Sequence, residues 1–492
     1  MQPRNRTSKL RSILASGLLF GALLSPLLPP TAWAQTSETE KVEREKVATI
    51  EELVRQNREL KARVERIELE HRSIREPVRE EPARVEVPMS GFPLRPTLLA
   101  EVDYRVYPHE LEGNVGFALA RLRPGLVLAP TSWMRAVATV EFAGENPAIL
   151  DSFVRLRAAK WAEFTIGYSK PPLFASFAYE LEHLLPFPDR SSVVSTFGVQ
   201  RDVGVDVHVS PESIPFEGWL RIGNGTGSAL GNDNALPAAY GLFDLVLGRA
   251  WTARHPEPHD TGLRLGVSGL AEKARDRDGL SGHTPLGFVY YRPIVVSGVR
   301  LVGEAHAIGY LGALRLTLEG AIAREERDRD DDGNPATPRV SLPSLSSYGL
   351  GAELAWTILG TPRQVGIGPR AREAKPVVPA ESDPAATTPE PSSSKWNGGA
   401  LEVAVRYDGL FLNRRAEDVR RGGSHNGGLA LKWWPVDFMT ATVASYLTRY
   451  EDPPIEEPAE KWSWGLVGRI GFFWGIGAQQ PSSVRAVDPS RR

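Results

Sequence analysis

Residues 461–474, with the sequence KWSWGLVGRIGFFW, alternate between two kinds of side chain. One row is almost entirely large and apolar and comprises Trp462, Trp464, Leu466, Gly468, Ile470, Phe472 and Trp474. The other row is mostly small or polar and carries one charge, on Arg469. Alternation with a period of two is typical of a β-strand with different surroundings on its two faces. Aromatic residues at both ends of the apolar row favour a transmembrane barrel strand, because such residues settle at the two membrane interfaces. A strand of a soluble β-sandwich is the alternative from this stretch alone.

The same alternation recurs from residue 98 onward, and the polar row of most strands carries charge. Val154 and Leu156, for example, alternate with Arg155 and Arg157. A water-filled lumen tolerates such charges, whereas a dry core would require tight pairing. We expect strands at 98–107, 115–128, 134–143, 153–157, 162–170, 201–210, 215–223, 239–253, 262–273, 286–294, 299–309, 314–324, 347–358, 401–408, 428–434, 438–450 and 461–474. A bacterial barrel has an even number of strands. One segment of this odd set, in the crowded region 286–325, is therefore expected not to belong to the wall. The pattern predicts an all-β protein, a transmembrane antiparallel β-barrel of about 16 strands.

The expected connections alternate between short and long. Residues 211–214 and 435–437 are short, like periplasmic turns, whereas 171–200, 223–237 and 326–346 are long, like outer loops. The segment 361–395 is rich in Pro, Ser and Thr, and this composition predicts a flexible insertion. The odd number of expected strands leaves open the side of the membrane on which this segment lies.

The N-terminus has the pattern of a secretory signal. A basic stretch precedes the apolar residues 13–28, and Ala32-Trp33-Ala34 forms an A-x-A cleavage site, so residues 1–34 are expected to be a signal peptide. No later stretch approaches the roughly 18 apolar residues of a membrane helix. The chain has no cysteine, which excludes disulfides and thiolate metal sites. These features fit a protein of the Gram-negative outer membrane.

Residues 35–76 differ from the rest and predict a short periplasmic coiled coil. From Ile50 the apolar residues follow a heptad, with Leu53 and Leu60 at the d position and Asn57 at an a position. Residues 63–68, RVERIE, resemble a known trimerisation pattern, so a homotrimer is expected. A single amphipathic helix folded against the barrel is the alternative. The Pro-rich residues 77–96 form an expected linker, the barrel covers 97–474, and 475–492 form a C-terminal tail.

Several blocks resemble the phosphate-selective porins of the O and P type. Residues 151–173, DSFVRLRAAKWAEFTIGYSKPPL, are similar to that family's paired strands and Gly-x-x-Lys-Pro turn. Residues 201–205, RDVGV, and 224–227, NGTG, resemble two further motifs, as do 398–407, GGALEVAVRY, and 431–450. The resemblance implies a 16-stranded trimeric porin that passes anions by diffusion. It also implies that the third loop, here about 174–200, folds into the pore.

Arginines at lumen-facing positions are the candidate pore-lining residues. The candidates are Arg105, Arg121, Arg123, Arg155, Arg157, Arg190, Arg201, Arg315 and Arg406, with Arg469 at the same parity in the last strand. Their charge would raise the local concentration of small anionic solutes. Glu101, Asp103, Glu319 and Glu402 share the lumen-facing rows, and the family's lysine cluster is absent, so we expect a mild anion preference.

Other chemistry finds little support in the sequence. Asp328, Asp330, Asp332 and Gly333 spell the opening of a calcium loop, but the twelfth position is Arg339 instead of Glu, so an acidic solvated loop is the preferred interpretation. No G-x-S-x-G elbow or phosphate-binding glycine loop indicates an enzyme, and no cofactor is expected. The net charge of −2 implies no bulk attraction to nucleic acid. The function expected is therefore passive diffusion through an outer-membrane porin. The alternative is a structural barrel whose coiled coil anchors it in the periplasm or to the cell wall.

Overall fold

The computed structural model describes residues 55, 94–107, 115–211, 213–225, 227, 231–232, 236–252, 259–329, 338–370, 398–452 and 461–475. The chain divides into two units, 1–89 and 90–492, and of the first unit only Arg55 is described. The expected signal peptide and coiled coil, most of the linker and insertion, and the tail after Gly475 lie outside the described residues. Among the described residues, no helix is long and apolar enough to cross a membrane.

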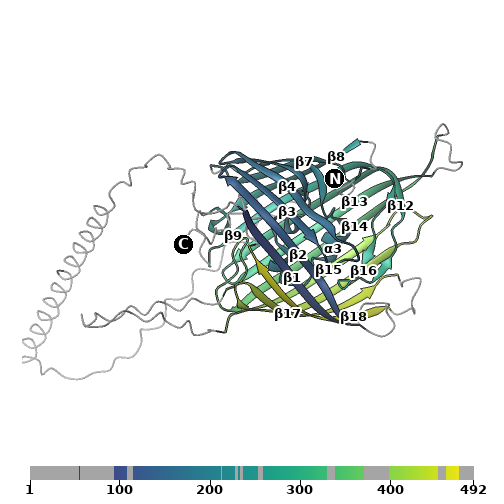
Figure 1. The fold of residues 1–492 in the computed structure, drawn as a ribbon. Coiled ribbons are helices and arrows are strands. Elements are labelled where there is room, and N and C mark those ends of the chain that lie inside the picture. The colour runs from purple at the N-terminus through teal and green to yellow at the C-terminus, as the bar shows by residue number, and fades with distance from the viewer. Residues whose placement is uncertain are drawn as a thin grey trace, which may run out of the picture. The chain divides into compact units, whose positions relative to one another are not determined.

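The second unit is a closed antiparallel barrel of 16 strands (Figure 1). The wall strands are β1 (Leu94–Val106), β2 (Gly116–Thr131), β3 (Met134–Glu141), β4 (Ala148–Ala159), β5 (Ala162–Ser169), β6 (Asp202–Val209), β7 (Phe216–Gly223), β8 (Leu236–Leu247), β9 (Gly262–Asp278), β12 (Val295–Leu311), β13 (Leu314–Arg329), β14 (Val340–Leu359), β15 (Ala400–Leu412), β16 (Gly422–Val436), β17 (Met439–Tyr450) and β18 (Trp462–Trp474). A short helix, α4 (Arg249–Thr252), follows β8. Pairing of β1 with β18, from Leu98 opposite Trp474 to Val106 opposite Leu466, closes the barrel. The predicted fold class is confirmed.

The surplus strand is the one expected at 286–294. In its place the chain forms β11 (Val289–Tyr291), which pairs only with β10 (Gly282–His283) and takes no part in the wall. The expectation that the error in the strand number lay within 286–325 is confirmed. Alternation alone could not distinguish a wall strand from a short hairpin, because both place apolar residues at every second position.

The two faces of the wall differ in the way that the last strand predicted. In β18, Trp464 and Ile470 point outward and are about half exposed, whereas Val467 and Arg469 point inward and are buried. The exposed large apolar residues recur along nearly every wall strand, and the buried charged residues lie on the opposite row. An apolar outer surface of this kind suits contact with lipid, and this barrel is transmembrane.

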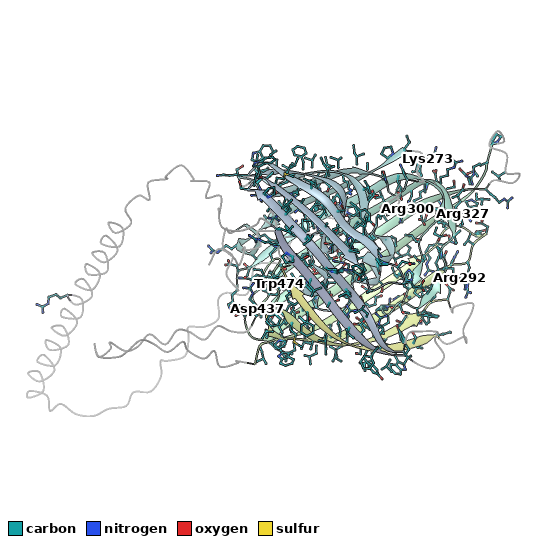
Figure 2. All side chains as sticks on the ribbon, in the orientation of Figure 1. Lys273, Arg292, Arg300, Arg327, Asp437 and Trp474 are labelled. Carbon is teal, nitrogen blue, oxygen red and sulfur yellow. The ribbon has the colours of Figure 1, made fainter. Side chains whose placement is uncertain are left out.

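The two ends of the barrel differ in the length of their connections. The turns after β2, β4, β12 and β16 are short, and the first residues of β1 and the last of β18 lie at this end, which we call the turn end. Two longer connections also start and end there: residues 248–261 between β8 and β9, which hold α4, and the segment between β14 and β15, which holds the insertion 361–395. The other end, the loop end, carries the remaining long connections. Figure 2 shows Asp437 and Trp474 at the turn end, and Lys273, Arg292, Arg300 and Arg327 at the loop end.

Candidate pore and its inner loop

Residues 170–200, between β5 and β6, fold into the barrel and are called the inner loop. They contain α2 (Ala175–Tyr179), the 3₁₀ turn η1 (Glu182–Leu184) and α3 (Ser192–Phe197). Phe174, Val193 and Phe197 are fully buried, although the segment connects two surface strands. Phe174 has a φ of 63°, a left-handed conformation that is strained for a bulky residue, and its amide donates to Ser268 Oγ at 3.0 Å. The sharp inward turn is thus held by packing and by a wall hydroxyl. The family resemblance implied an inward loop at about 174–200, but not the contacts that hold it.

Inward-facing glycines of the wall make room for the inner loop. A Cβ atom on Gly349 of β14 would lie 2.9 Å from Phe197 Cε2 and 3.1 Å from Val193 Cγ1. A Cβ atom on Gly428 of β16 would lie 2.9 Å from Phe187 Cε1. These separations are closer than real Cβ contacts, so the wall is shaped to accept the loop's apolar side chains.

Carboxylates of the wall bind the loop's donors. Glu319 of β13 accepts hydrogen bonds from the Ser176 amide at 3.0 Å and from its hydroxyl at 2.8 Å. The Tyr179 hydroxyl donates to Asp244 at 2.8 Å, and the Ser192 amide donates to Asp408 at 3.0 Å. Each of these three carboxylates is buried. Since a buried acceptor left without its donor is costly, the three contacts fix both helices in the lumen.

Cations of the wall hold the middle of the loop. Lys432 of β16 donates to the carbonyl oxygens of His183 and Leu185, both at 2.7 Å. Arg406 of β15 donates to the carbonyl oxygen of Asp189 at 2.8 Å, and Arg121 of β2 pairs with its carboxylate at 3.0 Å. Side chains of β2, β15 and β16 therefore bind the same loop. The sequence did not indicate these contacts.

Burial shifts the ionisation of two groups in the inner loop. Burial, reinforced by Lys432 and Lys170, lowers the pKa of His183 to about 3. Burial, with Arg190 and Arg201 nearby, also holds the pKa of Lys170 well below its ordinary value. Lys170 Nζ donates to the carbonyl oxygens of Phe177 and Glu180, at 3.2 and 3.1 Å. Burial in the docked loop therefore disfavours the protonated forms of His183 and Lys170.

A second segment also enters the lumen, from the loop end. Tyr290 of β11 shares a 2.8 Å hydrogen bond with Ser424 of β16, and Leu286 receives a hydrogen bond from Tyr107 at its carbonyl oxygen. Leu280, Tyr290 and Tyr291 belong to the same buried cluster as α3. The sequence predicted a wall strand here and missed this role. Both loops together fill part of the lumen.

A cavity of about 80 Å³ remains between the inner loop and the wall strands β1, β2, β3, β4, β5 and β7. Its charged lining residues are Arg123, Asp151, Arg155, Lys170, Glu180, Glu182 and Arg201, with His183 beside them. Three arginines and three carboxylates line it, and Lys170, whose pKa burial lowers, is the fourth basic group. Arg201 lies 3.1 Å from Asp151, and Arg123 pairs with Glu141 and Glu182. Arg155 donates to Thr165 Oγ1 at 3.3 Å and lies over the Phe153 ring.

The remaining candidate arginines lie in a second cavity or in ion pairs along the wall. Arg190, Arg315 and Arg406 line a smaller cavity of about 30 Å³, whose carboxylates are Glu180, Glu319, Glu353 and Asp408. Arg105 pairs with Asp103 at 2.8 Å, and Arg121 pairs with Glu101, Glu182 and Asp189. Arg157 is exposed and lies 3.1 Å from Glu163. Arg469, in β18, pairs with Asp103 at 2.6 Å. The structure gathers Arg123, Arg155 and Arg201 at one cavity and Arg190, Arg315 and Arg406 at another.

The acidic run considered for calcium is described only in part. Asp328 lies near the end of β13, and its carbonyl oxygen accepts a 3.4 Å hydrogen bond from Arg339, whereas Asp330 and Asp332 lie outside the described residues. Within the described ranges, no cluster of three or more His, Asp or Glu residues could hold a metal ion.

Fold and lumen together define a transmembrane β-barrel with an internal loop. No family model matches the sequence, and no curated protein matches it. Among solved structures, the chain is similar to OmpT, an outer-membrane protein of Vibrio cholerae in a trimer form, with 9% identity and a TM-score of 0.47 over 77% of this chain and 99% of that one. It is also similar to an anion-selective porin from Comamonas acidovorans, with 11% identity and a TM-score of 0.46 over 77% and 99% of the two chains. The outer-membrane channel DcaP of Acinetobacter baumannii gives 10% identity and a TM-score of 0.45 over 77% and 97%.

Proposed function

We propose that the protein is an outer-membrane porin, a passive channel for small anionic solutes such as phosphate. The observation that carries this proposal is the cavity of about 80 Å³ beside the inner loop, which Arg123, Arg155 and Arg201 line together. Cations in a confined, partly desolvated passage raise the local concentration of anions. Because most of these arginines also pair with carboxylates, the preference is mild. No step of this function requires an enzyme's catalytic groups or a cofactor.

The remaining parts of the chain fit the same proposal. The apolar outer face contacts lipid of a Gram-negative outer membrane, the turn end faces the periplasm, and the coiled coil 35–76 lies there. The protein is a homotrimer in this proposal, and residues 63–68 contribute to its assembly. The tight turns at one end and long loops at the other support this orientation.

The test is single-channel recording of the purified full-length protein in a planar bilayer. We expect discrete conductance steps, and a reversal potential in a salt gradient that indicates preference for chloride or phosphate over potassium. A preference for potassium would overturn the anion proposal, and the absence of any conductance would overturn the channel itself.

A second function, a structural envelope-anchoring barrel, is favoured by one observation. The inner loop and the β10–β11 segment pack into the lumen through apolar clusters as well as hydrogen bonds. A barrel that only anchors would conduct no ions, and its residues 35–76 would bind the cell wall. Sedimentation with purified peptidoglycan, compared between the full chain and a chain without 35–76, separates this function from the channel.

A further inference from the structure

The outer face of the barrel changes character abruptly near the loop end of β9 and β13. Along β9 the outward row runs through Leu263, Leu265, Val267 and Ala271 and then reaches Lys273 and Arg275. Along β13 it runs through Leu314, Leu316, Leu318 and Ile322 and then reaches Arg324. Lys273, Arg275 and Arg324 are exposed, and the side chains beside them on the inward row are buried. We call these three residues the rim patch.

The height of the rim patch corresponds to a membrane boundary. β9 begins at Gly262 and β13 at Leu314, both at the turn end. The first outward-facing cation of each strand therefore follows the roughly 9–11 residues that a tilted strand needs to cross the hydrocarbon layer. Tyr348 on β14, which lies opposite Ile322 of β13, and Trp462, the first residue of β18, are exposed. Aromatic side chains of this kind mark the interfacial region. Lys273 and Arg324 therefore lie where lipid headgroups begin.

The two strands bring the patch together across β12. Lys273 is opposite Val299, and Arg324 is opposite Leu301, two residues further along the same strand. The two cations thus flank a short apolar stretch of β12, whose outward side chains are exposed. A headgroup above this stretch could reach both cations while its acyl chains lie on the apolar face below.

Two carboxylates lie near the rim patch, and each has a hydrogen-bond partner outside it. Asp276 follows Arg275 and is held by Arg339, whose Nη1 lies 2.9 Å from Asp276 Oδ2. Glu326 shares the outward row of Arg324, and its Oε2 accepts a 2.8 Å hydrogen bond from the Val299 amide. Within the described part of the chain, no ion pair joins Lys273, Arg275 or Arg324 to a carboxylate. Going from the turn end to the loop end, Lys273 precedes Asp276 along β9, and Arg324 precedes Glu326 along β13.

We propose that the rim patch binds the phosphate groups of a phosphorylated glycolipid in the outer leaflet. Arginine and lysine are the side chains suited to phosphate, and basic clusters beside a membrane surface bind anionic headgroups. The inference rests on the proposed orientation, in which the loop end faces outward, but it is independent of what passes through the lumen. The patch lies on the outer wall, away from the cavity that the channel would use.

The test measures lipid retention by the full-length protein in detergent, by native mass spectrometry after incubation with diphosphorylated lipid A. The variant K273Q/R324Q removes both cations that flank β12. Its matched control, R415Q/R421Q, also removes two positive charges, from exposed residues between β15 and β16. Migration on unboiled gels verifies that all variants retain the folded barrel.

We expect the wild type and R415Q/R421Q to retain lipid A equally, and K273Q/R324Q to lose roughly tenfold or more of this binding. Dephosphorylated lipid A should bind about as weakly to the wild type as lipid A does to the variant. Equal retention of lipid A by K273Q/R324Q and the wild type would overturn the proposal. Equal retention of phosphatidylglycerol and lipid A by the wild type, or displacement of lipid A by inorganic phosphate, would overturn the assignment to a glycolipid. Because no ion flux is measured, a failed channel test leaves this result unaffected.

Discussion

At the scale of single residues, the absence of a side chain at Gly349 determines how α3 is seated. We expect Gly349→Val to push α3 away from β14, since the added methyl groups would overlap the Phe197 ring and Val193. Overpacking of this kind costs about 1–3 kcal/mol, which the loop can relieve by moving while the wall keeps its hydrogen bonds. Single-channel conductance should therefore rise, and migration of the folded barrel on unboiled gels should not change. Gly468→Val is the matched control, because a Cβ atom there meets nothing within 4 Å. Equal conductance of both variants would mean that α3 does not limit the passage.

Arg155 is the residue through which we expect the larger cavity to favour anions. It is buried, lines that cavity and donates a hydrogen bond to Thr165 Oγ1. Arg155→Gln should lower the anion-to-cation permeability ratio by roughly two- to fivefold, most strongly at low ionic strength, where screening is weak. Arg157→Gln provides the control, because Arg157 is exposed and already paired with Glu163. Reversal potentials in a potassium chloride gradient measure both effects. If the two variants shift equally, or neither shifts, the cavity beside Arg155 is not the route for ions.

His183 makes docking of the inner loop dependent on pH. Its pKa in the docked loop is about 3, below the ordinary value near 6.5, because the ring is buried and lies near Lys432. The undocked loop therefore binds more protons between these two values, and docking weakens as pH falls below about 6.5. Between pH 7.5 and 5 the loss amounts to at most about 2 kcal/mol. We expect conductance or its open fraction to increase over this range in the wild type. His183→Phe keeps the aromatic contact with Phe473 and cannot titrate, so its conductance should be constant over the same range.

At the scale of elements, the sequence predicts the wall well and the lumen poorly. Outward residues such as Trp464 and Ile470 meet lipid whatever their neighbours, so a local period of two is sufficient to find strands. The inner loop was expected from its resemblance to a family, whereas the entry of 279–294 was not expected at all. Its position depends on Gly465 and Ser424, which are distant in sequence and neutral in any local pattern. The candidate arginines were identified by parity, but whether one lines a cavity depends on which carboxylate faces it across the barrel. The inward glycines Gly349 and Gly428 were the one sequence signal that could have indicated a packed lumen.

The two inward segments are expected to affect transport differently. The inner loop lines the larger cavity, whereas none of that cavity's lining residues comes from 279–294. Replacing residues 175–197 with a short Gly/Ser linker should raise conductance severalfold and reduce anion preference, because α2, η1 and α3 leave the lumen. Replacing 281–291 in the same way should change both quantities much less. Planar-bilayer recordings of the two variants, with unboiled-gel migration as the folding control, measure the difference. A larger effect of the second replacement would place the ion route near β10 and β11 instead.

At the scale of the whole molecule, the expected coiled coil and the barrel are separable contributors to assembly. Closure of β1 on β18 leaves no unpaired wall edge, so the barrel does not depend on a partner chain for its backbone hydrogen bonds. The heptad residues lie outside the described residues, apart from Arg55 at an f position, which is helical and exposed. Substitutions in 35–76 should therefore weaken the trimer without unfolding the barrel of each chain.

Leu53→Asp combined with Leu60→Asp places two charges at expected core positions of the coiled coil. We expect the detergent-solubilised trimer to dissociate at lower temperature, since burying charges between helices is costly, while each monomer keeps the faster migration of a folded barrel until boiling. Arg55→Asp combined with Ala62→Asp is the matched control, because the two residues occupy the f positions of consecutive heptads and face away from the expected core. Temperature series on unboiled gels, with analytical ultracentrifugation to count the chains, follow both properties. If the core variant dissociates at the same temperature as the control, residues 35–76 do not hold the trimer together. The alternative, a single helix folded against the barrel, then accounts better for their heptad pattern.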